Sequence, residues 1–160
     1  MPAYELPGAV PFNEALKKGA SLPFTAPELG HDDLAFLQYT GGTTGVAKGA
    51  MLTNRNLIAN LQQASAWLSA ATSEGREIII TALPLYHIFS LTANCLTYMK
   101  IGGLNHLITN PRDMPGFVKE LRSVPFTTIT GVNTLFNGLL NTPGFAEIDF
   151  SNLKLAICLL

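Results

Sequence analysis

The chain has 160 residues, a formal net charge of −1, and 13% charged against 48% apolar residues. So few charges and so many apolar residues exclude an intrinsically disordered chain. The near-neutral balance, with no basic cluster, leaves no electrostatic footprint for nucleic acid. A chain of this length makes one domain and buries about two-thirds of the surface that its unfolded form exposes. We therefore expect a globular α/β domain with a well-buried core.

The first thirty residues differ in composition from the rest. They hold half of the chain's prolines and show little periodicity, with one short helix expected near 13–18. No cationic region followed by an apolar region marks a secretory signal, so we expect a cytoplasmic protein. We interpret residues 1–30 as an irregular connecting segment of a larger enzyme and residues 31–160 as part of an α/β domain.

From residue 34 onward, strand and helix patterns alternate. Apolar runs predict strands at 34–39, 49–52, 77–83, 104–109, 126–130 and 153–158. Thr53 is the expected N-cap of a helix whose apolar residues recur at steps of three and four. Further helices are expected at 89–99, from either 110–111 or 113, and at 132–140. This order predicts right-handed βαβ units and a mainly parallel sheet with flanking helices.

Residues 78–99 contain no Asp, Glu, Lys or Arg and are long enough to span a bilayer. Pro84 interrupts the stretch, and several hydroxyl, amide and imidazole side chains lie within it. We interpret it as a buried strand, a loop and a buried helix, with a transmembrane helix as the alternative. Cys95 and Cys158 also lie in apolar runs, with a spacing that suits neither a metal nor a disulfide framework, so we expect two buried thiols.

A stretch rich in glycine and threonine, YTGGTTGVAKG at 39–49, follows the first expected strand. Phosphate binding needs backbone N–H groups that approach oxygen closely, and glycine permits both this approach and the φ > 0 turns of anion-binding nests. Threonine hydroxyls add donors and can ligate Mg²⁺, and a lysine adds a point charge. The alternative is a glycine-rich hairpin that only turns the chain. The residues with phosphate-binding chemistry are Gly41, Gly42, Thr43, Thr44, Gly45 and Lys48.

This stretch is not a Walker A loop. That motif has a hydroxyl residue directly after its lysine and then a helix whose N-terminus faces the phosphates. Here Gly49 follows Lys48, and the next residues predict a strand. With no acidic strand end of the Walker B kind either, the sequence argues against a P-loop nucleotide hydrolase.

Several stretches resemble the adenylate-forming enzymes, a superfamily that includes acyl-CoA synthetases, luciferases and the adenylation domains of peptide synthetases. YTGGTTGVAKGAMLT at 39–53 is similar to their phosphate-loop signature, LPLYHIFSLT at 83–92 to their second core motif, and TGVNTLFNGLLN at 130–141 to their acyl-pocket helix. Together with the rest of 32–61, these motifs most resemble bacterial long-chain fatty-acid–CoA ligases. The resemblance covers nearly the whole chain.

The resemblance implies a two-step reaction. A fatty acid attacks the α-phosphate of ATP to give an acyl-adenylate and pyrophosphate, and the thiol of coenzyme A then displaces AMP. Because the first step gathers negative charge on phosphate oxygens, fixed donors and Mg²⁺ are the expected catalysts. Carried over onto this sequence, residues 40–48 would surround the β- and γ-phosphates. Thr43, Thr44 and Lys48 would contact the phosphates, and Thr40 would contact Mg²⁺.

Two further sets of residues carry an expected role and an open alternative. His87 stands where the second motif places an aromatic or imidazole residue near the acyl carboxylate, or it is a core histidine satisfied by backbone groups. Val132, Asn133 and Leu135 would border the acyl channel, or they pack a helix on the sheet in the ordinary way.

Other parts of the superfamily pattern are missing from the sequence. There is no Y-G-x-T-E segment for adenine, no T-G-D segment for the ribose, and no C-terminal domain with a catalytic lysine. We therefore expect an internal piece of the large N-terminal domain of a ligase, inactive by itself. Alternatives are another branch, such as an aryl-CoA ligase or a peptide-synthetase adenylation domain, and a non-catalytic nucleotide-binding module. The resemblance further implies peripheral association with the inner membrane face and a homodimer.

Overall fold

The structure is a computed structural model that describes residues 6–40, 45 and 47–159. It divides into two compact units, Met1–Gly30 and His31–Leu160. In the first unit a single helix, α1, spans Phe12–Ala20 where the short helix is expected. None of its residues is buried, so this unit has no core around that helix.

The second unit contains two sheets. Strands β1 (Leu34–Thr40) and β2 (Lys48–Thr53) form an antiparallel hairpin. The other sheet has the order β4-β3-β5-β6, and every neighbouring pair in it is parallel. The predicted parallel sheet is thus confirmed. Its strands are β3 (Ile78–Thr81), β4 (Leu104–Leu107), β5 (Thr128–Val132) and β6 (Leu155–Leu159).

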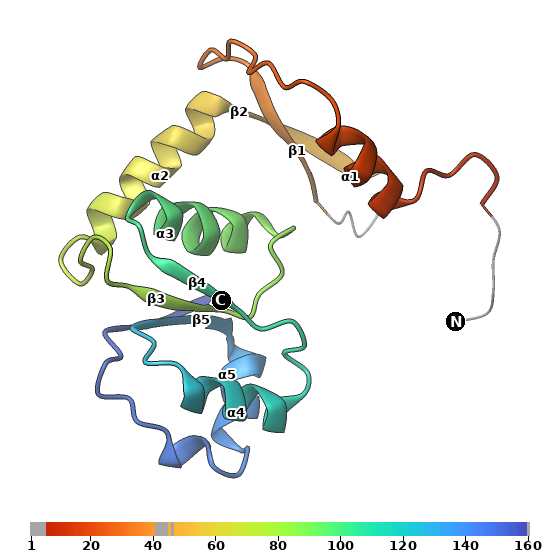
Figure 1. The fold of residues 1–160 in the computed structure, drawn as a ribbon. Helices are drawn as coiled ribbons and strands as arrows, with labels where there is room; N and C mark the ends of the chain where they lie inside the picture. The colour runs from red at the N-terminus through yellow and green to blue at the C-terminus, as the bar shows by residue number, and fades with distance from the viewer. Residues whose placement is uncertain (1–5, 41–44, 46, 160) are drawn as a thin grey trace. The chain divides into compact units, whose positions relative to one another are not determined.

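Helices cover both faces of the parallel sheet (Figure 1). One face carries α2 (Asn54–Leu68) and a continuous helical segment made of the π-helix η1 (Ser90–Leu96) and α3 (Thr97–Lys100). The opposite face carries α4 (Met114–Ser123) and α5 (Asn133–Leu140), and the short 3₁₀ helix η2 (Phe145–Glu147) precedes β6. A simple α-helix was expected at 89–99, so the π-helix is a departure from the prediction.

The helix starts follow the sequence signals. Thr53 caps α2 as expected, because its Oγ1 accepts from the Asn56 N–H while the Asn56 side chain accepts from the Thr53 N–H. These reciprocal bonds form a capping box with asparagine in the usual place of glutamate. Asp113 caps α4 through a bond from the Gly116 N–H at 3.1 Å. Both caps satisfy donors that a helix leaves unpaired.

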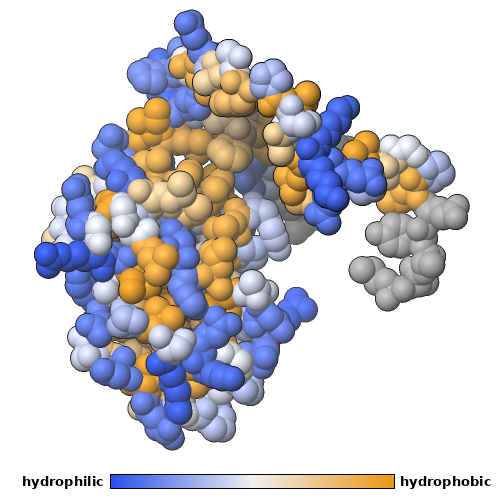
Figure 2. Space-filling view, viewed as in Figure 1, coloured by the Kyte–Doolittle hydropathy of each residue, from blue (hydrophilic) through white to orange (hydrophobic). Residues whose placement is uncertain are grey.

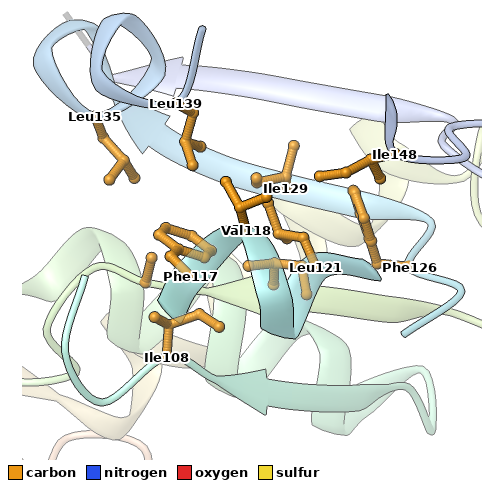
Figure 3. Close-up of a cluster of buried hydrophobic side chains, with 11 residues drawn as sticks. Ile108, Phe117, Val118, Leu121, Phe126, Ile129, Leu135, Leu139 and Ile148 are labelled. Atoms are coloured by element: carbon orange, nitrogen blue, oxygen red, sulfur yellow. The ribbon is translucent and has the colours of Figure 1, made fainter. Parts of the chain in front are cut away.

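The two faces of the sheet have different chemistry. Ile80 and Ile129 point toward α4 and α5, where they join a cluster of buried aliphatic and aromatic side chains that includes Phe117 and Leu121 (Figure 3). On the opposite face the apolar cluster is small, with Leu68, Ile79 and Tyr98 as its buried members. Alternation along a strand explains the contrast, since successive side chains point to opposite faces. Fully buried polar side chains fill the rest of this second interface: Thr81, Asn94, Thr128 and Thr130.

Residues 78–99 form β3, a loop and the helical segment, which confirms the interpretation of that stretch as a strand, a loop and a helix. In the part of the chain that the structure describes, no helix combines the length and apolarity needed to cross a membrane. The expectation of two buried thiols is wrong: Cys95 is only half-buried, and Cys158 is exposed. Its strand, β6, is the last strand of the described sheet and alternates exposed with half-buried residues.

Hydrophobic residues also reach the surface of the second unit, where Figure 2 shows them among hydrophilic ones. Large apolar side chains are exposed on the β1–β2 hairpin, on α2 and in the loop after β3, among them Leu37, Met51, Trp67 and Tyr86. Single exposed apolar residues are ordinary in folded proteins. Their concentration on the hairpin means that this element has little core of its own.

Candidate functional site

The Gly/Thr stretch joins β1 to β2. Thr40 and Lys48 are cross-strand partners at the end of the hairpin where this stretch begins and ends. Gly41, Gly42, Thr43 and Thr44 lie outside the described residues, and the Thr40 side chain does too, so the structure reports on Gly45 and Lys48, which are both exposed. Lys48 is the first residue of strand β2, so a strand and not a helix continues from it, as expected.

The hairpin is tightly paired just before the loop. Tyr39 faces Gly49 across the two strands, and a Cβ added at Gly49 would come within 3.3 Å of the Tyr39 ring. Glycine at this position therefore leaves room for the aromatic ring to lie over the neighbouring strand.

His87 lies in the loop between β3 and the π-helix, and its side chain is exposed in this chain. Its backbone N–H donates to the Pro84 carbonyl at 3.0 Å, and its Nδ1 accepts from the Phe89 N–H at 3.3 Å. A neutral imidazole whose Nδ1 accepts carries its proton on Nε2. The ring can therefore offer an N–H donor to an oxygen-rich ligand.

The hairpin and the His87 loop come together in space. Gln38 Nε2 donates to the carbonyl oxygen of Tyr86, the residue directly before His87, at 3.1 Å. Side chains from both segments also enclose a pocket of about 420 Å³. The pocket is lined by Phe36, Leu37, Gln38, Tyr39, Leu85, Tyr86 and Leu91. Two motifs that are far apart in sequence thus meet beside one cavity.

The predicted acyl-pocket residues divide between two environments. Val132 and Leu135 line a second pocket, of about 370 Å³, together with Leu83, Pro84 and Met114. Leu135 also belongs to the buried core, in line with ordinary packing of this helix on the sheet. Asn133 does not line that pocket; its Oδ1 accepts from the Cys158 thiol at 3.1 Å.

Sequence reasoning missed Gln38, Ser90 and Asn94. Ser90 Oγ donates to the Leu83 carbonyl oxygen at 2.8 Å, and Asn94 bonds to side chains of two strands. The available signal was the presence of polar side chains inside the otherwise apolar stretch 78–99. For Gln38 no sequence pattern pointed to a partner 48 residues away.

Comparison with known proteins identifies the family. The model of the family described as AMP-binding enzyme matches residues 4–159. The chain belongs to the AMP-binding enzyme family. This confirms the expected membership among adenylate-forming enzymes.

Named relatives within the AMP-binding family are consistent with the ligase resemblance. The long-chain-fatty-acid–CoA ligase of Escherichia coli O6:H1 is 60% identical over 156 residues, and that of Salmonella typhimurium is 58% identical. ATP-bound MatB from Rhodopseudomonas palustris has a similar structure, with a TM-score of 0.74 and 26% identity over 91% of this chain. The chain spans 28% of the length of each of these proteins.

Proposed function

We propose that this chain is the phosphate-loop and acyl-site part of an ATP-dependent long-chain fatty-acid–CoA ligase. The reaction joins a fatty acid to ATP, giving acyl-adenylate and pyrophosphate, and then forms a thioester with coenzyme A and releases AMP. In this assignment residues 31–160 are part of the adenylating domain, and residues 1–30 are a connecting segment. High identity to named ligases and the ATP-bound structural neighbour support the proposal.

One observation carries the assignment of the site. The Gln38–Tyr86 hydrogen bond brings the strand that leads into the Gly/Thr loop beside the segment that carries His87. An adenylating enzyme must hold the α-phosphate of ATP close to the carboxylate of the acid, because reacting atoms have to lie about 3–3.5 Å apart. A phosphate loop and an acyl-binding histidine on adjoining segments would meet this requirement.

The proposed roles follow from the chemistry of each side chain. Thr43, Thr44, Lys48 and the loop glycines would hold the β- and γ-phosphates. The Nε2–H of His87 would donate to the acyl carboxylate and to the carbonyl of the acyl-adenylate. Val132 and Leu135 would contact the acyl chain, and Asn133 would lie at the border of its channel.

Mg²⁺ would fit this site if it were bound mainly through the phosphates of ATP. The described residues contain no group of three or more His, Cys, Asp or Glu that could enclose a metal ion. Mg²⁺ often keeps several waters and binds through substrate phosphates with few protein ligands. The Thr40 hydroxyl would be such a ligand, and bound Mg²⁺ would neutralise phosphate charge. We further propose cytoplasmic localisation with peripheral association at the inner membrane face, and a homodimer, on the resemblance alone.

The proposal is tested with the gene product that contains residues 1–160. The purified protein is given ATP, Mg²⁺ and coenzyme A with either palmitate or 4-coumarate, and acid-dependent AMP release is measured. The proposal predicts a higher kcat/KM for palmitate. A preference for 4-coumarate would assign the protein to an aryl-CoA branch, and absence of any acid-dependent AMP would overturn the ligase assignment.

A further inference from the structure

The π-helix places one amide side chain at the centre of the sheet. Asn94 is fully buried, and its Nδ2 donates to Thr81 Oγ1 at 3.2 Å and to Thr130 Oγ1 at 2.7 Å. These two threonines face each other across β3 and β5. Thr81 Oγ1 in turn donates to Asn105 Oδ1 on β4 at 3.0 Å. One side chain thus ties the helix to two strands directly and to a third through Thr81.

The two threonines stand just before the segments proposed to bind the acyl group. Thr81 is the last residue of β3, and the chain continues through Leu83 and Pro84, which line the pocket shared with Val132, to His87. Thr130 precedes Val132 by two residues on β5. In parallel sheets, ligands bind beyond the carboxyl ends of the strands. Asn94 therefore holds the two strands together at the point where they lead into the candidate site.

A second bond from the same π-helix reaches the loop itself. Ser90 is fully buried, and its Oγ donates to the Leu83 carbonyl oxygen at 2.8 Å. Ser90 and Asn94 both belong to η1, so one element is anchored to the loop at its start and to the strands further along. π-Helices are rare overall, but those that occur are often found at functional sites. A π-helix beside the candidate site agrees with this tendency.

Stability alone does not explain an amide at this position. The Asn94 Oδ1 is buried and has no hydrogen-bond partner among the described residues. An unpaired buried acceptor costs free energy, whereas apolar groups of similar shape can replace buried polar partners with little loss. The amide instead orients its neighbours, because its two N–H groups donate to both threonines and so fix their positions relative to the helix.

We propose that Asn94 is a positioning residue of the acyl-adenylating site, which acts through Thr81 and Thr130 to fix the position of the His87 loop relative to Val132. The inference rests on the function proposed above for His87 and Val132. It goes beyond that function by giving an orienting role to a residue that lines neither described pocket beside the site.

The chain offers a matched control for this role. Tyr98 is also fully buried on the same helical segment, and its hydroxyl donates to Thr128 Oγ1 at 2.7 Å. Thr128 is the first residue of β5, two positions further from the candidate site than Thr130. Asn94→Leu and Tyr98→Phe therefore each remove buried hydrogen bonds between this helix and β5, Asn94→Leu at the middle residue of the strand and Tyr98→Phe at its first residue.

The first measurement is steady-state kinetics of the full gene product. Misplacement of a site by a distant substitution can cost up to about 100-fold in rate, so Asn94→Leu should lower kcat/KM for palmitate by about 10- to 100-fold and leave the KM for ATP within about two-fold. Tyr98→Phe should leave both constants near their original values. Equal kinetic constants for the two variants would overturn the proposal.

The second measurement does not depend on activity. Hydrogen exchange followed by mass spectrometry should show faster exchange in peptides covering 83–90 and 130–133 for Asn94→Leu and unchanged exchange there for Tyr98→Phe. If the unaltered gene product forms no acyl-CoA, the proposed function fails and hydrogen exchange still decides the role of Asn94. If Asn94→Leu does not fold, Thr130→Val takes its place and should give the same kinetic and exchange pattern. Unchanged exchange in both peptides would contradict the proposal.

Discussion

Gln38 and Tyr86 are joined by a hydrogen bond from the Gln38 Nε2 to the Tyr86 carbonyl oxygen at 3.1 Å. This bond links the strand entering the Gly/Thr loop to the segment that carries His87. Because the bond is exposed to solvent, it adds little to the stability of the fold. Its importance lies in the relative placement of the two segments.

Replacing Gln38 with leucine should therefore affect activity more than folding. A single neutral hydrogen bond contributes about 0.5–1.5 kcal/mol, which corresponds to a loss of about 2- to 10-fold in kcat/KM for the fatty acid. The melting temperature should hardly change. Gln63→Leu, an exposed glutamine on α2, is the matched control and should leave kinetics unaltered. Equal activity of the two variants would show that the link has no functional role.

His87→Ala should lower kcat/KM for the fatty acid with the fold intact. Loss of a positioned proton donor or acceptor typically costs about 10²- to 10⁴-fold. Since His87 is exposed, its removal leaves no core cavity, and the melting temperature should stay close to that of the unaltered protein. His31→Ala, another exposed histidine, is the control. Normal activity of His87→Ala would remove this residue from the site.

An ion pair between a buried carboxylate and a partly exposed lysine should contribute to the pH dependence of stability in acid. Glu77 is buried just before β3, and Lys154, just before β6, donates to its Oε1 at 2.6 Å. Burial alone would raise the pKa of Glu77, but hydrogen bonds from Lys154, Thr127 and the Ser73 N–H together outweigh it and lower the pKa below 4.5. A carboxylate with a lowered pKa stabilises the fold above its unfolded pKa, and this stability is lost as the pH falls through the folded value.

Glu77→Gln should accordingly lower the free energy of unfolding at pH 7 by about 1.5–3 kcal/mol, the usual contribution of hydrogen bonds to a charged group. The difference from the unaltered protein should shrink as the pH falls below 4.5. Asp32→Asn removes an exposed pair with Arg55 and should cost less than about 1 kcal/mol. Urea titrations at several pH values test this, and a difference that persists unchanged into acid would refute the charge-based account.

Much of the fold could be predicted because local patterns and packing agree. The run Ile78-Ile79-Ile80 indicated a strand covered on both faces, and Ile79 and Ile80 are fully buried. Thr53 indicated the start of α2 because its cap depends only on residues close in sequence. The phosphate loop was recognised from a motif and not from geometry, and most of its residues lie outside the described part of the chain.

Other features depend on partners that are distant in sequence. The π-helix is fixed by bonds from Asn94 to two strands, and an apolar stretch with scattered polar residues does not show which of them point inward. The Gln38–Tyr86 bond joins a half-buried residue to an exposed one, and no periodic pattern in the sequence indicates it. Cys158 was expected to be buried from its apolar neighbours, but β6 alternates its faces and leaves the thiol exposed.

The 160-residue chain by itself should bind MgATP weakly and form no acyl-CoA. Its sequence contains the phosphate loop but no segment matching the adenine or ribose motifs, and ordering a loop for so few contacts costs entropy. Calorimetry should show no binding tighter than about 1 mM, which corresponds to ~4 kcal/mol. Micromolar affinity, or acyl-CoA formation above the buffer control, would mean that this chain holds a complete site.

The most direct test of the account is fatty-acid-dependent exchange between pyrophosphate and ATP in the full gene product, because it reports the adenylation step alone. Loss of one fixed donor to developing oxyanion charge costs on the order of 10²–10³ in rate, and Lys48→Ala and Thr44→Ala should each show a loss of this size. Melting temperatures should hardly move for Lys48→Ala, since Lys48 is exposed, and Lys119→Ala, an exposed lysine on α4, should retain full exchange. Exchange near the unaltered rate in both loop variants would contradict the account and leave the Gly/Thr stretch as a simple turn.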